Sequence, residues 1–481
     1  MATETRSPAA DEIMLPVQSA TGRWWIVPLL CLAALFLLVG MVVAYAVLQF
    51  QLGKRQSREA VEQEVARIQA AGEPITIDDL YAFHQVPDGT RDITSLWQEA
   101  LNGFNEQQLT ADAKSLPFVG ESTDERGFRL RADAADSALN EAEAFLQKYE
   151  ATREAVLVAS RARGQCRFPV QFEKGVTMLL PHAQQMRIVA RLLALDAHVR
   201  AARGDIQGAF ESLEGLFAAS EALNHQLTLV EHLVRLATLG HAIREANWLL
   251  NETPLTSEQL TRLEGKLRAA DIQGGLTTAL YGERAFSYHT FHHLETIQSE
   301  LPFKMTSNGK LTRPVDCLLS LELLGATIDA SREPFPDARA QVESVNSRLR
   351  VVMGSGNPLD KWNYMITGLM TPAVGASFEA TSRSLASRDA LLAAIAAERY
   401  RLANGSFPAQ LTDLVPAYLP QVPLDPFDGR TLRLVATDGE LMIYSIGRNH
   451  IDDLGSEMQH SGFPEDIVVR VRAEKGPTPT P

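Results

Sequence analysis

Histidines at helical spacing are the first residues of this chain that could do chemistry. Residues 287–295 read Ser-Tyr-His-Thr-Phe-His-His-Leu-Glu, so His289 and His293 lie four positions apart. On a helix this spacing puts both imidazoles on one face, where they could hold one transition metal. A metal-dependent hydrolase would also use His292, whereas histidines on a solvated or partly packed face need no metal. The sequence offers no clear further ligand and therefore favours the second interpretation.

Motifs of the common enzyme classes are missing from the sequence. It contains no G-x-S-x-G, no P-loop, no dinucleotide-binding glycine pattern and no C-x-x-C. Cys166 and Cys317 could pair in an oxidising compartment or remain as buried thiols, and their spacing does not decide between the two. We therefore predict a protein that is not an enzyme.

The last hundred residues predict a small α+β module. An apolar stripe at helical spacing over residues 388–403 predicts a helix, and Asn404-Gly405 supplies its end. Asp438-Gly439 is a hairpin turn signal between two runs that alternate like strands. Strands are expected at residues 431–436, 441–445 and 466–471.

Three motifs in this module resemble one known family. They are YRLANGSFP at 400–408, YLPQVPLDPFDG at 418–429 and IYSIGRNHIDDLG at 443–455. In combination and order they resemble the C-terminal globular domain of the major pseudopilin of type II secretion. The resemblance covers about the last fifth of the chain. The family's Gly-Phe-Thr-Leu-x-Glu processing site is absent before Trp24, which argues against a pilus subunit.

The resemblance implies a calcium site in the final loop. In the pseudopilin family this loop binds calcium through backbone carbonyls and through acidic or amide side chains. By position, the implied ligands are Asn449, Asp452 and Asp453, with Ser445 at the start of the loop. Calcium takes about six to eight oxygen ligands, so these side chains would supply part of its shell. His450 replaces the glycine usual in the family, and a loop of Asx turns is the alternative.

A mainly helical body is expected to position these sites. Residues 179–202 and 206–220 form the clearest pair of amphipathic segments, broken by Arg203-Gly204-Asp205, and resemble one tetratricopeptide-type hairpin. Because no second copy follows at the expected period, we predict one helix pair within a bundle and not a solenoid. Capping-box spacing at Thr76 and Thr256 marks two further helix starts.

An apolar run near the N-terminus predicts a membrane anchor. Trp24 to Phe50 carries no charged residue, and a bilayer core needs about 20 apolar residues in a helix. The predicted localisation is therefore the cell (inner) membrane, single-pass, with a periplasmic or extracytoplasmic body. Orientation stays open because Lys54 and Arg55 follow the run, and so does cleavage after Ala46.

Composition and order together predict domains and a role. A net charge of −14 excludes a nucleic-acid partner, because phosphate binding needs a basic face. We expect a non-catalytic binding or scaffold protein with an envelope protein as partner. Alternatives are a component of a type II secretion or pilus-like apparatus and the hydrolase described above. The predicted parts are a tail at 1–23, the anchor at 24–50, a helical domain at 54–383, the pseudopilin-like module at 384–472 and a disordered tail at 473–481.

Overall fold

In the computed structural model, the chain divides into two compact units, residues 1–59 and residues 60–481. The boundary falls inside the first helix, and all sites discussed below belong to the second unit. The predicted tail at 1–23 and the last six residues of the predicted tail at 473–481 lie outside the described residues. The structure describes residues 26–103, 105–113, 116–119, 137–300, 304–354, 356–370, 373–437, 439–456 and 466–475.

The predicted membrane anchor is wrong. Residues of the apolar run lie in α1 (Ile26–Ala70), which continues without a break through Lys54, Arg55 and Arg58. Among the residues that the structure describes, no helix combines the length and the apolar character needed to cross a bilayer. This finding overturns the predicted single-pass localisation, while Trp24 itself lies outside the described residues.

Helices dominate the second unit, and local signals explain where several begin. Thr76 and Thr256 both form the predicted capping boxes, with Asp79 and Gln259 as the reciprocal partners. Thr228 forms a third with Glu231. The helices up to residue 300 are α2 (Ile77–Phe83), α3 (Thr94–Asn102), α4 (Glu106–Asp112), α5 (Ser137–Lys148), α6 (Glu150–Arg161), η1 (Phe172–Thr177), α7 (Pro181–Ala202), α8 (Ile206–Ala222), α9 (Leu229–Glu252), α10 (Ser257–Ala269), α11 (Ile272–His292) and η2 (Leu294–Glu300).

The predicted hairpin at residues 179–220 is confirmed as α7 and α8. Gly204 adopts a left-handed backbone with φ +81°, and Asp205 caps α8 by accepting from the Gly208 amide. Helix α9 then packs against both members of the pair. The remaining helices are α12 (Pro314–Arg332), α13 (Asp337–Gly354), α14 (Pro358–Asn363), α15 (Met365–Met370), α16 (Ala373–Asn404) and η3 (Leu411–Leu414).

A three-stranded antiparallel sheet follows α16. Its strands are β1 (Arg433–Ala436), β2 (Glu440–Ser445) and β3 (Ile467–Arg472), in the order β1-β2-β3, close to the three predicted runs. The register pairs Leu434 with Ile443 and Ile443 with Val469. Asp438 of the predicted hairpin turn lies outside the described residues.

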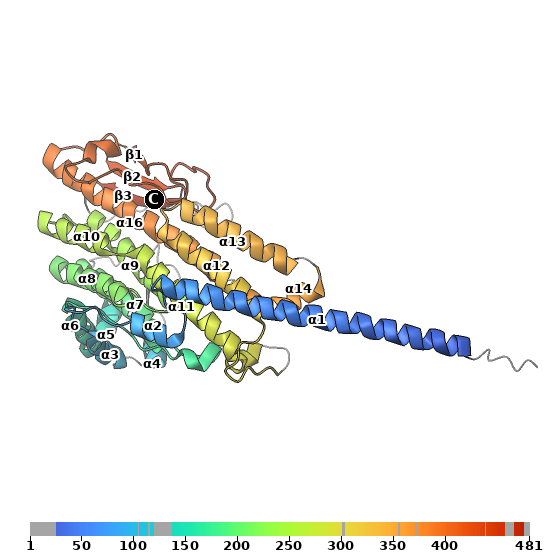
Figure 1. The fold of residues 1–481 in the computed structure, drawn as a ribbon. Coiled ribbons are helices and arrows are strands. Elements are labelled where there is room, and N and C mark those ends of the chain that lie inside the picture. The colour runs from blue at the N-terminus through green and yellow to red at the C-terminus, as the bar shows by residue number, and fades with distance from the viewer. Residues whose placement is uncertain are drawn as a thin grey trace, which may run out of the picture. The chain divides into compact units, whose positions relative to one another are not determined.

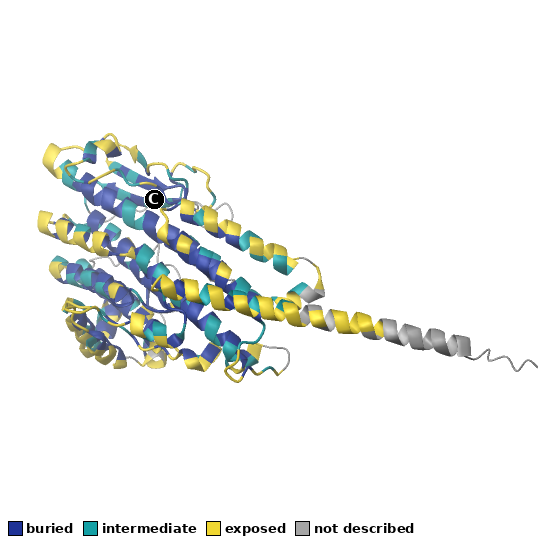
Figure 2. Ribbon diagram, viewed as in Figure 1, coloured by how far each residue is buried: buried dark blue, intermediate teal, exposed yellow. Residues whose placement is uncertain are grey.

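One hydrophobic core joins the sheet to the helices. Helix α16 packs against β2 and β3 on one side and against α9 on another, as Figure 1 shows. Ala393, Leu441 and Val471 belong to the same buried cluster as Leu193 of α7. Buried residues accordingly line the facing sides of α9 and α16 (Figure 2). The predicted domain boundary at 383/384 falls inside α16, so this helix serves both the helical body and the sheet.

Candidate metal centre

The predicted loop follows β2, and its first residues, Ser445 and Ile446, are bonded to the fully buried carboxylate of Asp425. Asp425 is 0% exposed, and its Oδ1 accepts hydrogen bonds from the Ser445 hydroxyl (2.8 Å) and the Phe427 amide (2.9 Å). Its Oδ2 accepts from the Ile446 amide (3.0 Å) and from Arg433 Nη1 (2.7 Å). Ser445, predicted at the start of the metal loop, is thus engaged with Asp425. Its hydroxyl anchors the loop.

Asn449, Asp452 and Asp453 lie in the same loop, where Asn449 bonds to Asp453 and Asp452 bonds to the backbone and to Tyr444. Asn449 Nδ2 donates to Asp453 Oδ2 at 2.9 Å, and Asn449 Oδ1 accepts from the Ile451 amide at 3.0 Å. Asp452 Oδ1 accepts from the Leu454 amide at 3.1 Å and from the Tyr444 hydroxyl at 3.0 Å. The Asx turns considered from the sequence are therefore present, and they draw the three side chains together.

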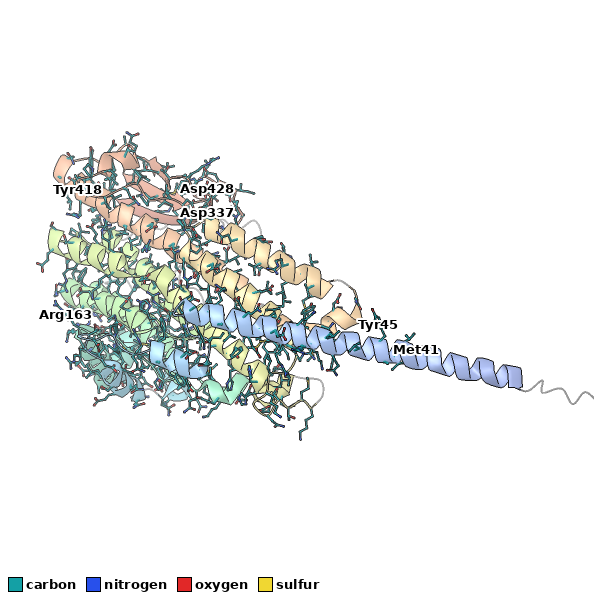
Figure 3. All side chains as sticks on the ribbon, viewed as in Figure 1. Met41, Tyr45, Arg163, Asp337, Tyr418 and Asp428 are labelled. Carbon is teal, nitrogen blue, oxygen red and sulfur yellow. The ribbon has the colours of Figure 1, made fainter. Side chains whose placement is uncertain are left out.

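Left-handed residues wind the loop tightly. His450 adopts φ +58° and Leu454 φ +58°, and the flanking Gly447 and Gly455 also have positive φ. His450 thus takes the conformation that glycine would favour at its position, so the substitution leaves the expected backbone turn in place. Its ring lies edge-on to Phe427. Asp428, which Figure 3 labels, lies on the turn after Asp425 and pairs with Arg433.

Asp466 is the residue that the sequence analysis missed. It lies directly before β3 and is 3% exposed, and its Oδ2 accepts from the Gly455 amide at 2.8 Å. Its Oδ1 is buried and has no hydrogen-bond partner among the described residues. An unpaired buried carboxylate oxygen is costly, because it has lost water without gaining a donor. The available signal was an acid placed at the start of an alternating apolar strand.

Negative charges crowd this end of the loop. Burial, with repulsion from the Asp453 and Asp452 carboxylates, raises the pKa of Asp466 from 3.8 to about 6, against the lowering effects of hydrogen bonds from the Gly455 and Asp453 amides. Burial and the neighbouring Asp452 also raise the pKa of Tyr444 to about 12. Arg433 faces the same group, with Nε 3.9 Å from Asp452 Oδ2. Three carboxylates thus share one region with the guanidinium of Arg433 beside Asp452 and that of Arg470 at the Gly455 carbonyl.

Side chains alone do not complete a metal shell here. Across the described ranges, no three His, Cys, Asp or Glu side chains are arranged to hold an ion. Calcium differs from transition metals in that backbone carbonyls and amide oxygens also serve as ligands. Carboxylate oxygens, such as those of Asp452, Asp453 and Asp466, are of the type that a hard cation prefers.

The histidine cluster is only partly assembled. His289 and His293 are neighbours as their spacing predicted, with stacked rings whose centroids are 4.4 Å apart. Burial, followed by the nearby His293, lowers the pKa of His289. His293 Nδ1 lies 3.1 Å from Glu295 Oε1, while His292 Nδ1 lies 2.9 Å from the Tyr288 carbonyl at the end of α11. The structure therefore brings two of the three histidines together and directs the third to the backbone.

Other histidines, scattered in the sequence, form buried pairs between α7 and α9. His182 Nε2 lies 2.6 Å from Glu231 Oε1, and His198 Nε2 lies 2.5 Å from Glu245 Oε2. His182 stacks on Phe168, which fixes the ring plane. These pairs bridge two helices that α8 separates in the sequence. No local spacing rule could have predicted them.

The two cysteines in the body are free and buried. Burial raises the pKa of the Cys166 thiol to about 12 and raises that of Cys317 further. Both are therefore protonated thiols at neutral pH.

No family model, no curated protein and no solved structure matches this chain.

Proposed function

We propose that this protein is a non-catalytic binding protein whose C-terminal loop holds a calcium ion. One observation carries the proposal: the Oδ1 of buried Asp466, beside Asp452 and Asp453, has no hydrogen-bond partner among the described residues. A divalent cation would neutralise the mutual repulsion of these carboxylates and supply the missing partner of Asp466. Binding the ion would therefore stabilise the folded loop relative to the unfolded chain.

Binding without catalysis fits the buried titratable groups. Burial lowers the pKa of His232 to about 3, so this ring is neutral at physiological pH and enclosed in the helical body. The thiols of Cys166 and Cys317 are held protonated by burial. The enclosed imidazole lacks the access that a general base needs, and the buried thiols lack both the access and the thiolate form that a nucleophile needs.

Calorimetry of the full chain with calcium or with a chelator tests the metal. Saturating calcium is expected to raise the melting temperature, since a ligand at one hundred times its Kd contributes about 2.7 kcal/mol. Asp466→Asn should abolish this response, because an amide cannot replace the missing negative charge. Asp329→Asn makes the same change at an exposed helix position, where the side chain is 66% exposed, and should keep the response. Unchanged melting of the wild-type protein in calcium would refute the site.

A second role, as a component of a type II secretion or pilus-like apparatus, draws support from one feature. Residues 373–472 run as one long helix followed by three antiparallel strands, which is the order that the resemblance implies. Affinity purification of the full chain with quantitative mass spectrometry tests this role. Enrichment of apparatus subunits is the expected result, and a purification without them counts against it.

A further inference from the structure

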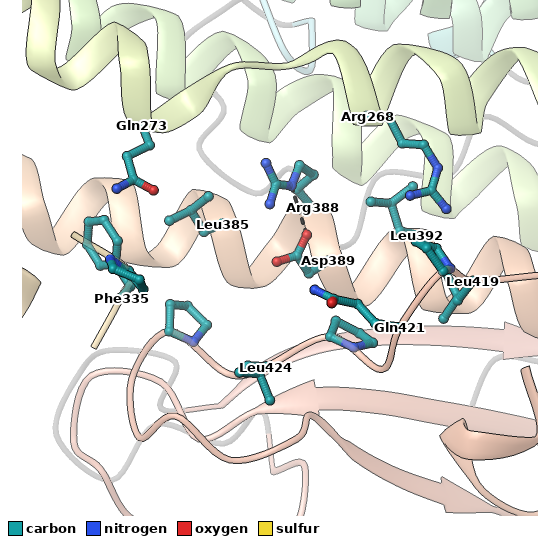
Figure 4. Close-up of a pocket in the computed structure, with 14 residues that line it drawn as sticks. Arg268, Gln273, Phe335, Leu385, Arg388, Asp389, Leu392, Leu419, Gln421 and Leu424 are labelled. Atoms are coloured by element: carbon teal, nitrogen blue, oxygen red, sulfur yellow. Dashed lines mark hydrogen bonds and ion pairs between the residues drawn. The ribbon is translucent and has the colours of Figure 1, made fainter. Parts of the chain in front are cut away.

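A cavity of about 530 Å³ lies between α16 and residues 419–426 (Figure 4). Its walls come from α16, from the end of α10 and the start of α11, and from residues 419–426. Phe335, just before α13, closes one end. The volume falls within the range of about 300–1,000 Å³ typical of small-molecule sites. Four segments far apart in the sequence thus build one concave site.

Apolar side chains form much of the wall. Leu385 and Leu392 of α16 and Leu419 opposite them are all buried, whereas Leu424 at the rim is 53% exposed. Three prolines of the same segment also line the cavity and restrict its backbone. A wall that is already stiff loses little conformational entropy when a ligand binds. The prolines are Pro420, Pro423 and Pro426.

The polar part of the cavity is cationic. Arg388 and Arg268 line it with Asp389. Asp389 accepts from Arg388 Nε at 2.8 Å, and Glu264 pairs with both Arg268 (2.9 Å) and Arg399 (2.6 Å). Three guanidinium groups against two carboxylates leave one net positive charge at the cavity. The whole chain has a net charge of −14, so the positive charge of the cavity differs in sign from the protein as a whole.

Arg388 has hydrogen-bonding capacity to spare. Its Nη1 reaches the Ala270 carbonyl at 3.5 Å, and no residue in the described ranges accepts from its Nη2. Its side chain is 22% exposed, so a ligand can reach it. A planar guanidinium matches the two oxygens of a carboxylate, and such charge-assisted bonds are among the stronger ones in proteins.

We propose that this cavity binds a small organic carboxylate, with its apolar body against the leucines and Phe335 and its carboxylate on Arg388. One net positive charge suits a monoanion better than a phosphate dianion, and the apolar wall suits a hydrocarbon body. This site is independent of the calcium proposal, because none of its lining residues belongs to the metal loop.

Isothermal titration of the full chain in chelator, with octanoate as the probe, tests the proposal. Octanoate should bind at least about tenfold more tightly than 1-octanol, which has the same chain without the charge. N-acetyl-leucine serves as a second arm. Tighter binding of this compound than of octanoate would assign the site to a chain terminus instead of a fatty acid. Equal binding of octanoate and octanol, or no heat up to about 1 mM octanoate, would overturn the proposal.

Variants locate the binding to this cavity. Arg388→Met keeps the length of the side chain without its charge and should weaken octanoate binding about tenfold or more. Arg383→Met makes the same change on α16 away from the cavity and should leave binding unchanged. Leu424→Asp, at the exposed rim, should also weaken binding through repulsion and keeps the test decisive if Arg388→Met fails to fold. Wild-type binding by both cavity variants would refute the assignment.

Discussion

Asp466 shows how one buried side chain can give a loop its chemistry. Its carboxylate has one oxygen bonded to the Gly455 amide and one without a partner among the described residues. Asp425, equally buried, has both oxygens satisfied by four donors. The contrast separates a structural carboxylate, which anchors the loop, from one with remaining capacity for a ligand.

The raised pKa of Asp466 predicts a pH-dependent stability. Its folded value of about 6 lies above the ordinary 3.8, so the folded protein holds this proton more tightly than the unfolded chain does. In chelator, its contribution to stability should therefore fall as pH rises between these two values. The loss is at most about 3 kcal/mol and smaller wherever solvent screens the group.

Chemical denaturation across this pH window measures the effect. Asp466→Asn cannot titrate, so its stability relative to wild type should increase from low to neutral pH. Asp329→Asn is the control and should follow the wild-type curve. A constant difference between wild type and Asp466→Asn across the window would contradict the shifted pKa.

Close helix packing is the main feature at the scale of elements. Gly282 of α11 lies against the connection between α8 and α9, where an added Cβ would meet the Leu227 carbonyl oxygen at 1.6 Å. No side chain fits there without movement of the backbone, because the obstacle is itself a main-chain atom. The glycine therefore sets how closely α11 approaches its neighbours.

Gly282→Ala is accordingly expected to destabilise the protein by about 3 kcal/mol or more, at the upper end of overpacking effects. Gly265→Ala in the exposed part of α10 is the matched control, since nothing lies within 4 Å of its added Cβ. There the substitution should stabilise by about 0.5–1 kcal/mol, through helix propensity alone. Urea denaturation followed by circular dichroism measures both, and similar effects at the two sites would contradict the packing argument.

At the scale of the whole molecule, the sheet is an integral part of the second unit. Asn251 of α9 acts on the edge of β3 much as a neighbouring strand would: its Nδ2 donates to the Arg470 carbonyl and its Oδ1 accepts from the Arg472 amide, both at 2.8 Å. A salt bridge of 3.2 Å between Arg472 of β3 and Glu252 of α9 adds a second contact between the strand and the helix. The helical body therefore covers an edge that would otherwise be open.

Replacing Asn251 tests this coupling. Asn251→Leu should lower the free energy of unfolding by about 1–3 kcal/mol, because it leaves two backbone groups of β3 without partners.

Residues 60–481 should still unfold in one transition, since the sheet and the helices share a core. Coincident unfolding curves by tryptophan fluorescence and far-ultraviolet circular dichroism are the expected result. A separate early transition of the sheet would show that the module is only loosely attached.

Local patterns determined much of the secondary structure. The capping boxes at Thr76 and Thr256, the α7–α8 pair and the three strands all rest on residues a few positions apart, whose interactions hold in any tertiary setting. The predicted anchor was wrong because, among the described residues, no helix has the length and the apolar character that a membrane span needs. Only packing could pair His198 with Glu245, bury Asp466 or bring Arg388 and Leu419 to one cavity, because each depends on contacts between segments distant in sequence.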